Sequence, residues 1–180
     1  MRVVCRASLI ILCAILLVPM FACSTGYGMD LYLFAERFND SARGRAHLDL
    51  AHFIVQDGDA GGRNYQAFVG NNELLEVYVL PSGRVHTAAL TGLPDMPHRD
   101  FYAAALHLLQ AFAALNGDRA ERLLGELQVG VLPVRGVHTI ERYGYRVSYA
   151  ANEAGRYVRL SCLRHLPTQP PLPTLRERID

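Results

Sequence analysis

The sequence predicts an α+β domain in which a single antiparallel sheet of about five strands carries helices on one face. Three observations lead to this prediction. Apolar residues recur at three- and four-residue steps in two separate stretches, which indicates amphipathic helices. Apolar and polar residues alternate in the segments between and after these stretches, which indicates strands. Short turns join those strands, and strands joined in this way must be antiparallel.

The first helix is expected to follow Met29. Asp30 is its candidate N-cap, because a carboxylate there can accept a hydrogen bond from the first turn. Gly44 is the expected stop, because glycine readily ends a helix. The apolar stripe of this N-terminal helix consists of Leu31, Phe34, Ala35, Phe38 and Ala42.

Strand-like runs follow at residues 52–56 and 65–69, with the glycine-rich loop 57–62 between them. Residues 74–80 and 85–90 then form a hairpin. Its register is expected to bring several apolar side chains to one face, with His86 on the same side: Leu75, Val77, Val79, Ala88 and Leu90.

Helical spacing returns at residues 98–117, where Asn116 and Gly117 are the expected end of the helix. Asp118 is the expected cap of a second, short helix, and Glu121 completes a capping box. The apolar positions of this central helix pair are Phe101, Ala105, Leu108, Leu109, Phe112, Leu123, Leu124 and Leu127.

Two further strands are expected at residues 142–150 and 156–165, joined by the turn 152–155. A four-residue turn places Ala151 opposite Arg156. It also pairs Tyr149 with Val158, Val147 with Leu160 and Tyr145 with Cys162, all on one face. The opposite face then carries Arg146, Ser148, Tyr157, Arg159 and Ser161.

Composition excludes one large class of function. The chain has 180 residues and a formal net charge of +1. Removal of residues 1–22 takes two arginines and no acid, so the remaining domain has a formal charge of −1. Proteins that bind nucleic acid normally carry a strong basic excess, so no nucleic-acid partner is expected.

Residues 1–22 are predicted to be a signal peptide. Arg2 and Arg6 form a positive start, and an apolar run of about 16 residues follows, shorter than a membrane span needs. Met20-Phe21-Ala22-Cys23 resembles the lipobox of bacterial lipoproteins. The resemblance implies that Cys23 is lipidated and anchors the protein to a membrane of the cell envelope, with residues 23–28 as a short tether. Ser24 implies the outer membrane where the organism has one.

Other processing routes stay open at this point. Cleavage after Ser24 would release a periplasmic or secreted protein, and an uncleaved segment would act as an anchor. Once the leader is removed, the remaining cysteines are Cys23 and Cys162. If Cys23 carries lipid, Cys162 is expected to be a buried thiol; if it does not, a Cys23–Cys162 disulfide becomes available.

The sequence indicates no catalytic residues, metal site or cofactor. In the loop 57–62, Asp57 and Asp59 begin like a calcium loop, but Gly61 and Phe68 stand where oxygen ligands are needed. No Gly-x-Ser-x-Gly, Cys-x-x-Cys or His-Glu-x-x-His motif occurs. A candidate site for an anion or an envelope partner consists of Arg142, Arg146, Arg159 and Tyr157; a solvated sheet face is the alternative.

These observations predict a domain over residues 29–166, followed by a proline-rich tail at 167–180 that is extended over the surface or loose. The expected function is a membrane-anchored, non-catalytic binding or scaffolding module. The alternatives are an exported hydrolase-like enzyme and a soluble periplasmic ligand binder. A pocket lined by convergent polar groups would favour the enzyme, and a flat apolar or arginine-rich patch would favour the binding module.

Overall fold

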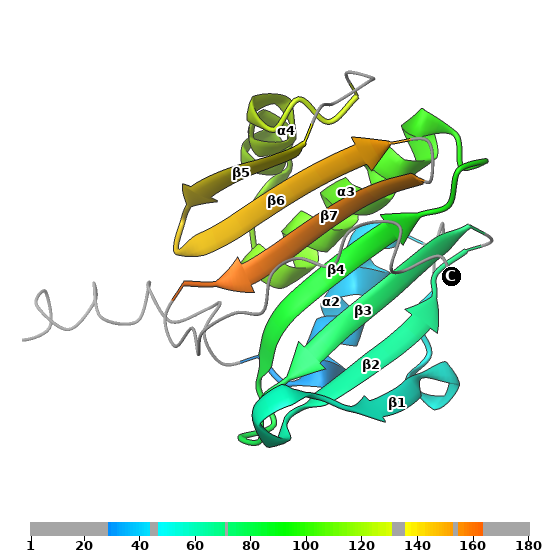
Figure 1. Ribbon diagram of the computed structural model, residues 1–180, viewed down its shortest axis with the longest axis vertical. Coiled ribbons are helices and arrows are strands. Elements are labelled where there is room, and N and C mark those ends of the chain that lie inside the picture. Colours follow the sequence, from blue (N-terminus) through cyan, green and yellow to red (C-terminus); the bar gives the residue numbers. More distant parts are fainter. Residues whose placement is uncertain (1–28, 44–46, 71, 131–135, 153–154, 164–180) are drawn as a thin grey trace, which may run out of the picture.

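A computed structural model describes residues 29–43, 47–70, 72–130, 136–152 and 155–163. Within these residues a seven-stranded antiparallel sheet carries its helices on one face (Figure 1). The helices are α2 (Leu31–Ala42), α3 (His98–Ala113) and α4 (Gly117–Glu126), with short 3₁₀ turns η1 (Leu50–His52) and η2 (Asp59–Gly61). The strands are β1 (Ile54–Asp57), β2 (Arg63–Phe68), β3 (Glu73–Val79), β4 (Val85–Gly92), β5 (Val137–Arg142), β6 (Tyr145–Asn152) and β7 (Gly155–Cys162).

The predicted α+β class and single antiparallel sheet are confirmed, but the sheet has seven strands rather than about five. The order across it is β1-β2-β3-β4-β7-β6-β5. Residues 142–150, predicted as one strand, contain the end of β5, a turn at Tyr143 and Gly144, and the start of β6. Both turn residues have positive φ, 56° and 84°, as a tight two-residue hairpin turn requires. Tyr-Gly is not the Asn-Gly or Asp-Gly signal by which such a turn is recognised.

Helix α2 begins as the sequence predicts. Asp30 accepts a hydrogen bond from the Leu33 amide at 2.8 Å, which satisfies one of the free donors of the first turn. The helix ends at Ala42, and Arg43 adopts the left-handed conformation with φ of 46°. Gly44, the predicted stop, lies outside the described residues.

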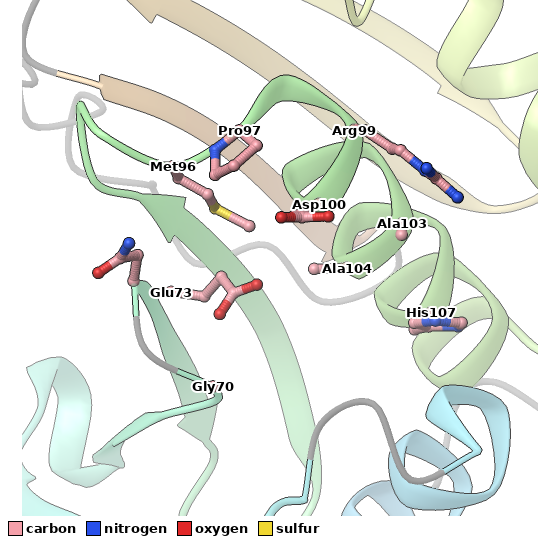
Figure 2. A pocket seen from close by; sticks show the side chains of 10 residues that line it. Gly70, Glu73, Met96, Pro97, Arg99, Asp100, Ala103, Ala104 and His107 are labelled. Atoms are coloured by element: carbon pink, nitrogen blue, oxygen red, sulfur yellow. The ribbon is translucent and has the colours of Figure 1, made fainter.

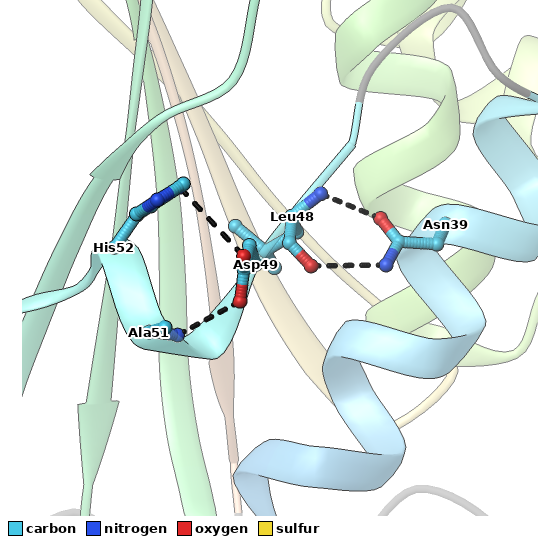
Figure 3. A network of polar contacts seen from close by, with 5 residues as sticks. All are labelled: Asn39, Leu48, Asp49, Ala51 and His52. Carbon is cyan, nitrogen blue, oxygen red and sulfur yellow. Dashed lines mark hydrogen bonds and ion pairs between the residues drawn. The ribbon is translucent and has the colours of Figure 1, made fainter.

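The segment that leads from α2 to the sheet is fixed by side-chain hydrogen bonds (Figure 3). The Asn39 amide donates to the Leu48 carbonyl at 3.0 Å and accepts from the Leu48 amide at 2.7 Å. Asp49 caps η1 by accepting from the Ala51 amide at 2.9 Å, and its second oxygen lies 3.8 Å from His52 Nδ1. The chain therefore turns into β1, which begins at Ile54 rather than at the predicted residue 52.

The predicted register of the β3–β4 hairpin is confirmed for its apolar residues, all of which are buried. His86 was predicted to share their face, and this is wrong. The pairing shifts between Tyr78 and Val79, so that Tyr78 faces Thr87 and Val79 faces Val85. His86 is the extra residue of this bulge, and its ring packs edge-on against Tyr78 on the opposite face.

The boundary between α3 and α4 differs from the prediction. Helix α3 ends at Ala113, and Ala114 takes the left-handed conformation there. Asn116 then caps α4 by accepting from the Arg119 amide at 3.1 Å. The cap is therefore Asn116 rather than Asp118, which lies inside the first turn of α4.

The core lies between α2, α3 and the sheet, and aromatic rings fill it. Ring centroids lie 6.3 Å apart for Phe34 and Phe112 and 5.5 Å apart for Phe112 and Tyr145. Phe101 lies against β4 so closely that a Cβ on Gly92 would come within 2.6 Å of it. Glycine at this position therefore allows α3 to approach the sheet.

The described chain begins and ends at the same end of the sheet. The Met29 carbonyl accepts from the Val85 amide at 2.9 Å, at the start of β4. Past the end of β7, the Leu163 amide donates to the Gly144 carbonyl at 3.0 Å. Because β4 and β7 are neighbours, the connections to the N-terminal and C-terminal segments leave the domain side by side.

Candidate functional site

The candidate site lies on the outer face of the sheet, which is the face turned away from α2, α3 and α4 (Figure 1). Strand register places three cross-strand rows on this face. The rows are Tyr78, Thr87, Ser161 and Arg146; then Glu76, Ala89, Arg159 and Ser148; then Leu74, Thr91, Tyr157 and Ala150.

Three of the four predicted site residues lie together on the outer face, namely Arg146, Arg159 and Tyr157. Arg142 does not join them. It ends β5 opposite Tyr145, whose side chain is in the core, and its Nε lies 3.7 Å from Glu126 Oε2 on α4. The misplacement follows directly from the turn at residues 143–144, which the sequence analysis did not detect.

The charge of Arg146 is balanced on the sheet itself. Its Nη2 and Nε donate to Glu141 Oε1 at 2.7 and 2.9 Å, across the β5–β6 pair. A guanidinium that is already held by a carboxylate is a weaker anchor for an added anion. The three arginines predicted as a cluster therefore do not converge as cations. The outer face carries Arg159 and the neutral ion pair of Arg146 with Glu141.

Tyr157 is buried on the outer face, with only 5% of its surface exposed. Burial raises the pKa of its hydroxyl to about 12, although the neighbouring Arg159 guanidinium acts in the opposite direction. Its cross-strand neighbours are Thr91 and Ala150, which are both small. Arg159, two residues farther along β7 on the same face, forms a side-chain hydrogen bond with Tyr157.

Small side chains form the floor around Tyr157. Hydroxyl pairs link the strands, with 3.3 Å between the Thr87 and Ser161 oxygens and 2.9 Å between those of Thr139 and Ser148. The floor residues are between 3% and 5% exposed: Thr87, Ala89, Thr91, Ser148 and Ser161.

The glycine-rich loop 57–62 borders the outer face at Tyr78. The Tyr78 hydroxyl donates to the Asp59 carbonyl, and a Cβ on Gly62 would lie 2.5 Å from that hydroxyl. A Cβ on Gly58 would come within 2.8 Å of the ring. These two glycines therefore permit the tyrosine ring to pack against the loop.

A second feature is a pocket of about 460 Å³ between the start of β3 and the first turns of α3 (Figure 2). Glu73 from β3 and Asp100 from α3 line it, with His107 farther along the helix. Burial raises the pKa of Glu73, and the charge of Asp100 adds to this, while a hydrogen bond with the Asn72 backbone opposes it. Sequence reasoning missed the pair because its members are far apart in the chain.

The remaining predicted residue is Cys23, which lies outside the described residues, as do the tether and the proline-rich tail. Cys162 is described: it is a buried free thiol, and burial raises its pKa to about 11. In the part of the chain that the structure describes, no group of three or more His, Cys, Asp and Glu side chains could hold a metal ion. No helix in that part is long and apolar enough to cross a bilayer.

No family model matches the chain, and no curated protein or solved structure matches it either. Its function is therefore inferred from the residues and geometry described above.

Proposed function

We propose that this protein is a bacterial cell-envelope lipoprotein, anchored through lipid on Cys23, whose domain binds a protein partner on the outer face of the sheet without catalysis. The observation that supports this most directly is the make-up of that face. Small hydroxyl and methyl side chains form a floor over β4, β7 and β6, with Tyr157 and Arg159 among them on β7 and Tyr78 beside them on β3.

This surface suits an extended polypeptide. Its small side chains pair with one another, Thr87 with Ser161 and Ser148 with Thr139, so a partner that lies over them leaves no hydroxyl of these pairs unsatisfied, while the half-buried Tyr78 ring provides apolar contact. The pairing of Arg146 with Glu141 leaves little excess positive charge, so a polyanion gains less here than a neutral segment does. A protein segment is therefore the partner chemistry that the face fits best.

The proposed anchor would hold the domain close to the membrane. Residues 24–28 separate Cys23 from Met29, whose carbonyl accepts a hydrogen bond from Val85 of β4. At about 3.3 Å per residue this tether spans roughly 20 Å at most. Partners on the same membrane would then lie within reach of the outer face.

Mass spectrometry of the mature N-terminus from native membranes tests the anchor, with a Cys23→Ser variant as its control. We expect a diacylglyceryl adduct on Cys23, and loss of both the adduct and membrane partitioning in the variant. An unmodified N-terminus at Thr25, with the protein in the supernatant, would contradict the lipoprotein assignment.

Site-specific photo-crosslinking in native membranes tests the binding face. A benzophenone amino acid at Ala150 would lie on the outer face, and the same group at Tyr143 is the matched control, because Tyr143 is exposed at the β5–β6 turn. We expect an adduct of defined mass, other than a dimer of the chain, from Ala150 alone, and its loss in Arg159→Ala. Equal adducts from both positions would contradict a specific binding face.

A second candidate function rests on the pocket at Glu73. A carboxyl whose pKa is raised by burial and a nearby carboxylate is suited to acid–base chemistry, which favours the hydrolase-like alternative. Turnover of a panel of nitrophenyl esters, phosphates and glycosides, measured for the native chain and Glu73→Gln, tests it. Turnover that is lost in the variant would support the enzyme, whereas no turnover by the native chain would count against it.

A further inference from the structure

Strand β1 forms one edge of the sheet (Figure 1), and among the described residues no strand pairs with its outer side. The side chains at this edge are apolar and open to solvent. Ile54 is 62% exposed and Val55 is 50% exposed. Phe68, at the end of the neighbouring strand β2, is 62% exposed. Unpaired backbone amides and carbonyls beside exposed apolar side chains are the features by which a sheet edge accepts a further strand.

Strand β1 lacks the features that commonly keep a sheet edge from pairing. Such edges are protected by proline, by positive charge or by a bulge. The β1 sequence is Ile-Val-Gln-Asp, and its pairing with β2 runs without a shift of register from Ile54 to Asp57. At the other edge, β5 ends in Glu141 and Arg142, which both form ion pairs. Of the two edges that the structure describes, the one at β1 is therefore the more open to a further strand.

The edge of β1 is complementary to a second copy of itself. Two antiparallel edge strands can be related by a two-fold axis perpendicular to the sheet, which keeps the helices of both copies on the same side. The backbone is extended over residues 53–57, with Val55 at the midpoint. A two-fold axis at Val55 therefore places this residue opposite Val55 of the second copy. It also places Ile54 opposite Gln56, and Phe53 opposite Asp57.

This pairing brings apolar side chains together on both faces of the sheet. On the helix side, Val55 lies opposite Tyr65, and the Phe53 ring packs edge-on against Tyr65 with 5.9 Å between centroids. The same three side chains of the second copy would lie next to them. On the outer face, the Ile54 side chains of the two copies become diagonal neighbours, about 7–8 Å apart. Side chains that are exposed in one copy are therefore covered in the pair.

Charge favours the antiparallel arrangement. Asp57 is the one charged residue of β1, and in the antiparallel pair the two Asp57 side chains lie at opposite ends. Four residues separate them along the strands, or about 13 Å, which exceeds the distance of about 8 Å over which physiological salt screens charge. Each Asp57 instead lies at the end of the second copy that carries His52, an exposed side chain that is a cation when protonated. Parallel pairing in register would place the two carboxylates side by side.

We propose that two copies of this protein join through the edges of β1, antiparallel about a two-fold axis at Val55, so that their sheets become continuous. Because the axis is perpendicular to the sheet, the outer faces of both copies point in the same direction. The proposal stands on the pattern of exposure and charge at β1, and it does not depend on the binding face proposed above.

Disulfide trapping in intact native cells tests the pairing. Directly opposite residues of antiparallel strands have Cα atoms about 4.5–5.5 Å apart, which is within the range of a disulfide. We expect Val55→Cys to form a disulfide-linked dimer of the chain under mild oxidation. Val137→Cys is the matched control, because Val137 is 51% exposed on the other edge strand, and it should give no more dimer than the native chain. No dimer from Val55→Cys, equal amounts from both variants, or an adduct of the Val55→Cys chain with a different protein would overturn the proposal.

Charge substitution at Val55 tests the position of the axis, because a residue on the axis faces its own copy. We expect the full chain, purified in detergent, to be a dimer by sedimentation. Val55→Lys and Val55→Asp should each dissociate at least tenfold more readily, because like charges meet, and a mixture of the two variants should restore the dimer, because opposite charges meet. Val137→Lys should remain a dimer. Circular dichroism checks that each variant is folded, as substitution of a half-exposed side chain leaves the core intact.

A monomeric native chain, or a dimer that Val55→Lys does not weaken, would overturn the proposal. Failure of the mixture to restore the dimer, with both variants folded, would overturn the two-fold axis at Val55.

Discussion

On the helix side of the sheet, Leu90 and Val158 are fully buried beneath α3, whereas on the outer face Thr91 and Tyr157, their neighbours in the same strands, are almost as buried with no described helix above them. The helix side is apolar and is filled by aromatic rings. The outer face is built of hydroxyls, methyl groups and a few long polar side chains.

The difference teaches that alternation of apolar and polar residues indicates which face meets the helices, but not how deeply the other face is covered. Polar alternation is usually taken to mean contact with water. Here small polar side chains that pair with one another, such as Thr87 with Ser161, are compatible with burial because their hydroxyls are satisfied across the strands.

The largest effect is expected in the aromatic core. Phe101→Ala removes a ring that is fully buried against Tyr149 and Gly92. It should lower the free energy of unfolding by about 3–5 kcal/mol, since a cavity remains where the ring was. Urea denaturation measures this. Phe68→Ala, at a ring that is 62% exposed, is the control and should cost less than about 1 kcal/mol. Equal losses of unfolding free energy in the two variants would mean that the exposed ring contributes as much to stability as the buried one.

The next effect sharpens the comparison at the outer face. Tyr157→Ala should lower the free energy of unfolding by about 2 kcal/mol, since it removes a buried ring that forms a hydrogen bond with the Arg159 side chain. Urea denaturation measures the loss. A loss below about 0.5 kcal/mol would show that burial on the outer face contributes little to stability.

A smaller effect is expected at the margin of the outer face. Arg146→Ala breaks the pair with Glu141, and the coupling energy between the two should be about 0.2–1 kcal/mol because both side chains are partly exposed. A cycle with Glu141→Ala, measured at low salt and at 1 M salt, isolates the pair. A coupling that does not weaken with salt would argue against an ion pair.

The smallest effect is expected at the pocket on the other side of β3. Burial raises the pKa of Glu73 in the folded protein, so the folded state favours the protonated carboxyl. The protonated carboxyl therefore contributes stability at low pH, and this contribution is lost as the pH rises through the folded-state pKa. Glu73→Gln should therefore stabilise the protein at pH 7 relative to pH 4, by no more than about 0.5 kcal/mol because solvent screens the site. Thermal melts of the native chain and of Glu73→Gln from pH 4 to 8 measure this difference. A larger stabilisation of the variant at pH 4 than at pH 7 would contradict a raised pKa of Glu73.

Much of the fold could be predicted because the pairing of strands within each hairpin follows from the alternation of apolar and polar residues and from the length of the turn. All the predicted partners of the last hairpin, from Tyr145 with Cys162 to Ala151 with Arg156, are paired as expected. The edge strand β5 was missed because its turn uses Tyr143, a residue that rarely adopts positive φ. That one error also placed Arg142 on the wrong face.

The candidate site could be predicted only in part. Arg146, Arg159 and Tyr157 were brought together by strand alternation, which the sequence carries. The pairing of Arg146 with Glu141 depends on β5 and was therefore not foreseen. The approach of Glu73 to Asp100 depends on how α3 packs on the sheet, a contact between distant segments that no local pattern encodes.

The central pair of strands has a consequence for how the protein is made. Every other strand pairing joins neighbours in the chain, whereas β4 pairs with β7, so that Thr87 meets Ser161. As the polypeptide is synthesised from its N-terminus, the meander of β1 to β4 can form first, and the free edge of β4 stays unpaired until β7, the last strand of the sheet in the chain, has been made. An open, apolar strand edge is where nascent chains join one another. The interval between synthesis of Gly92 and of Gly155 is therefore the period in which the edge of β4 has no strand to pair with and is open to association with other chains.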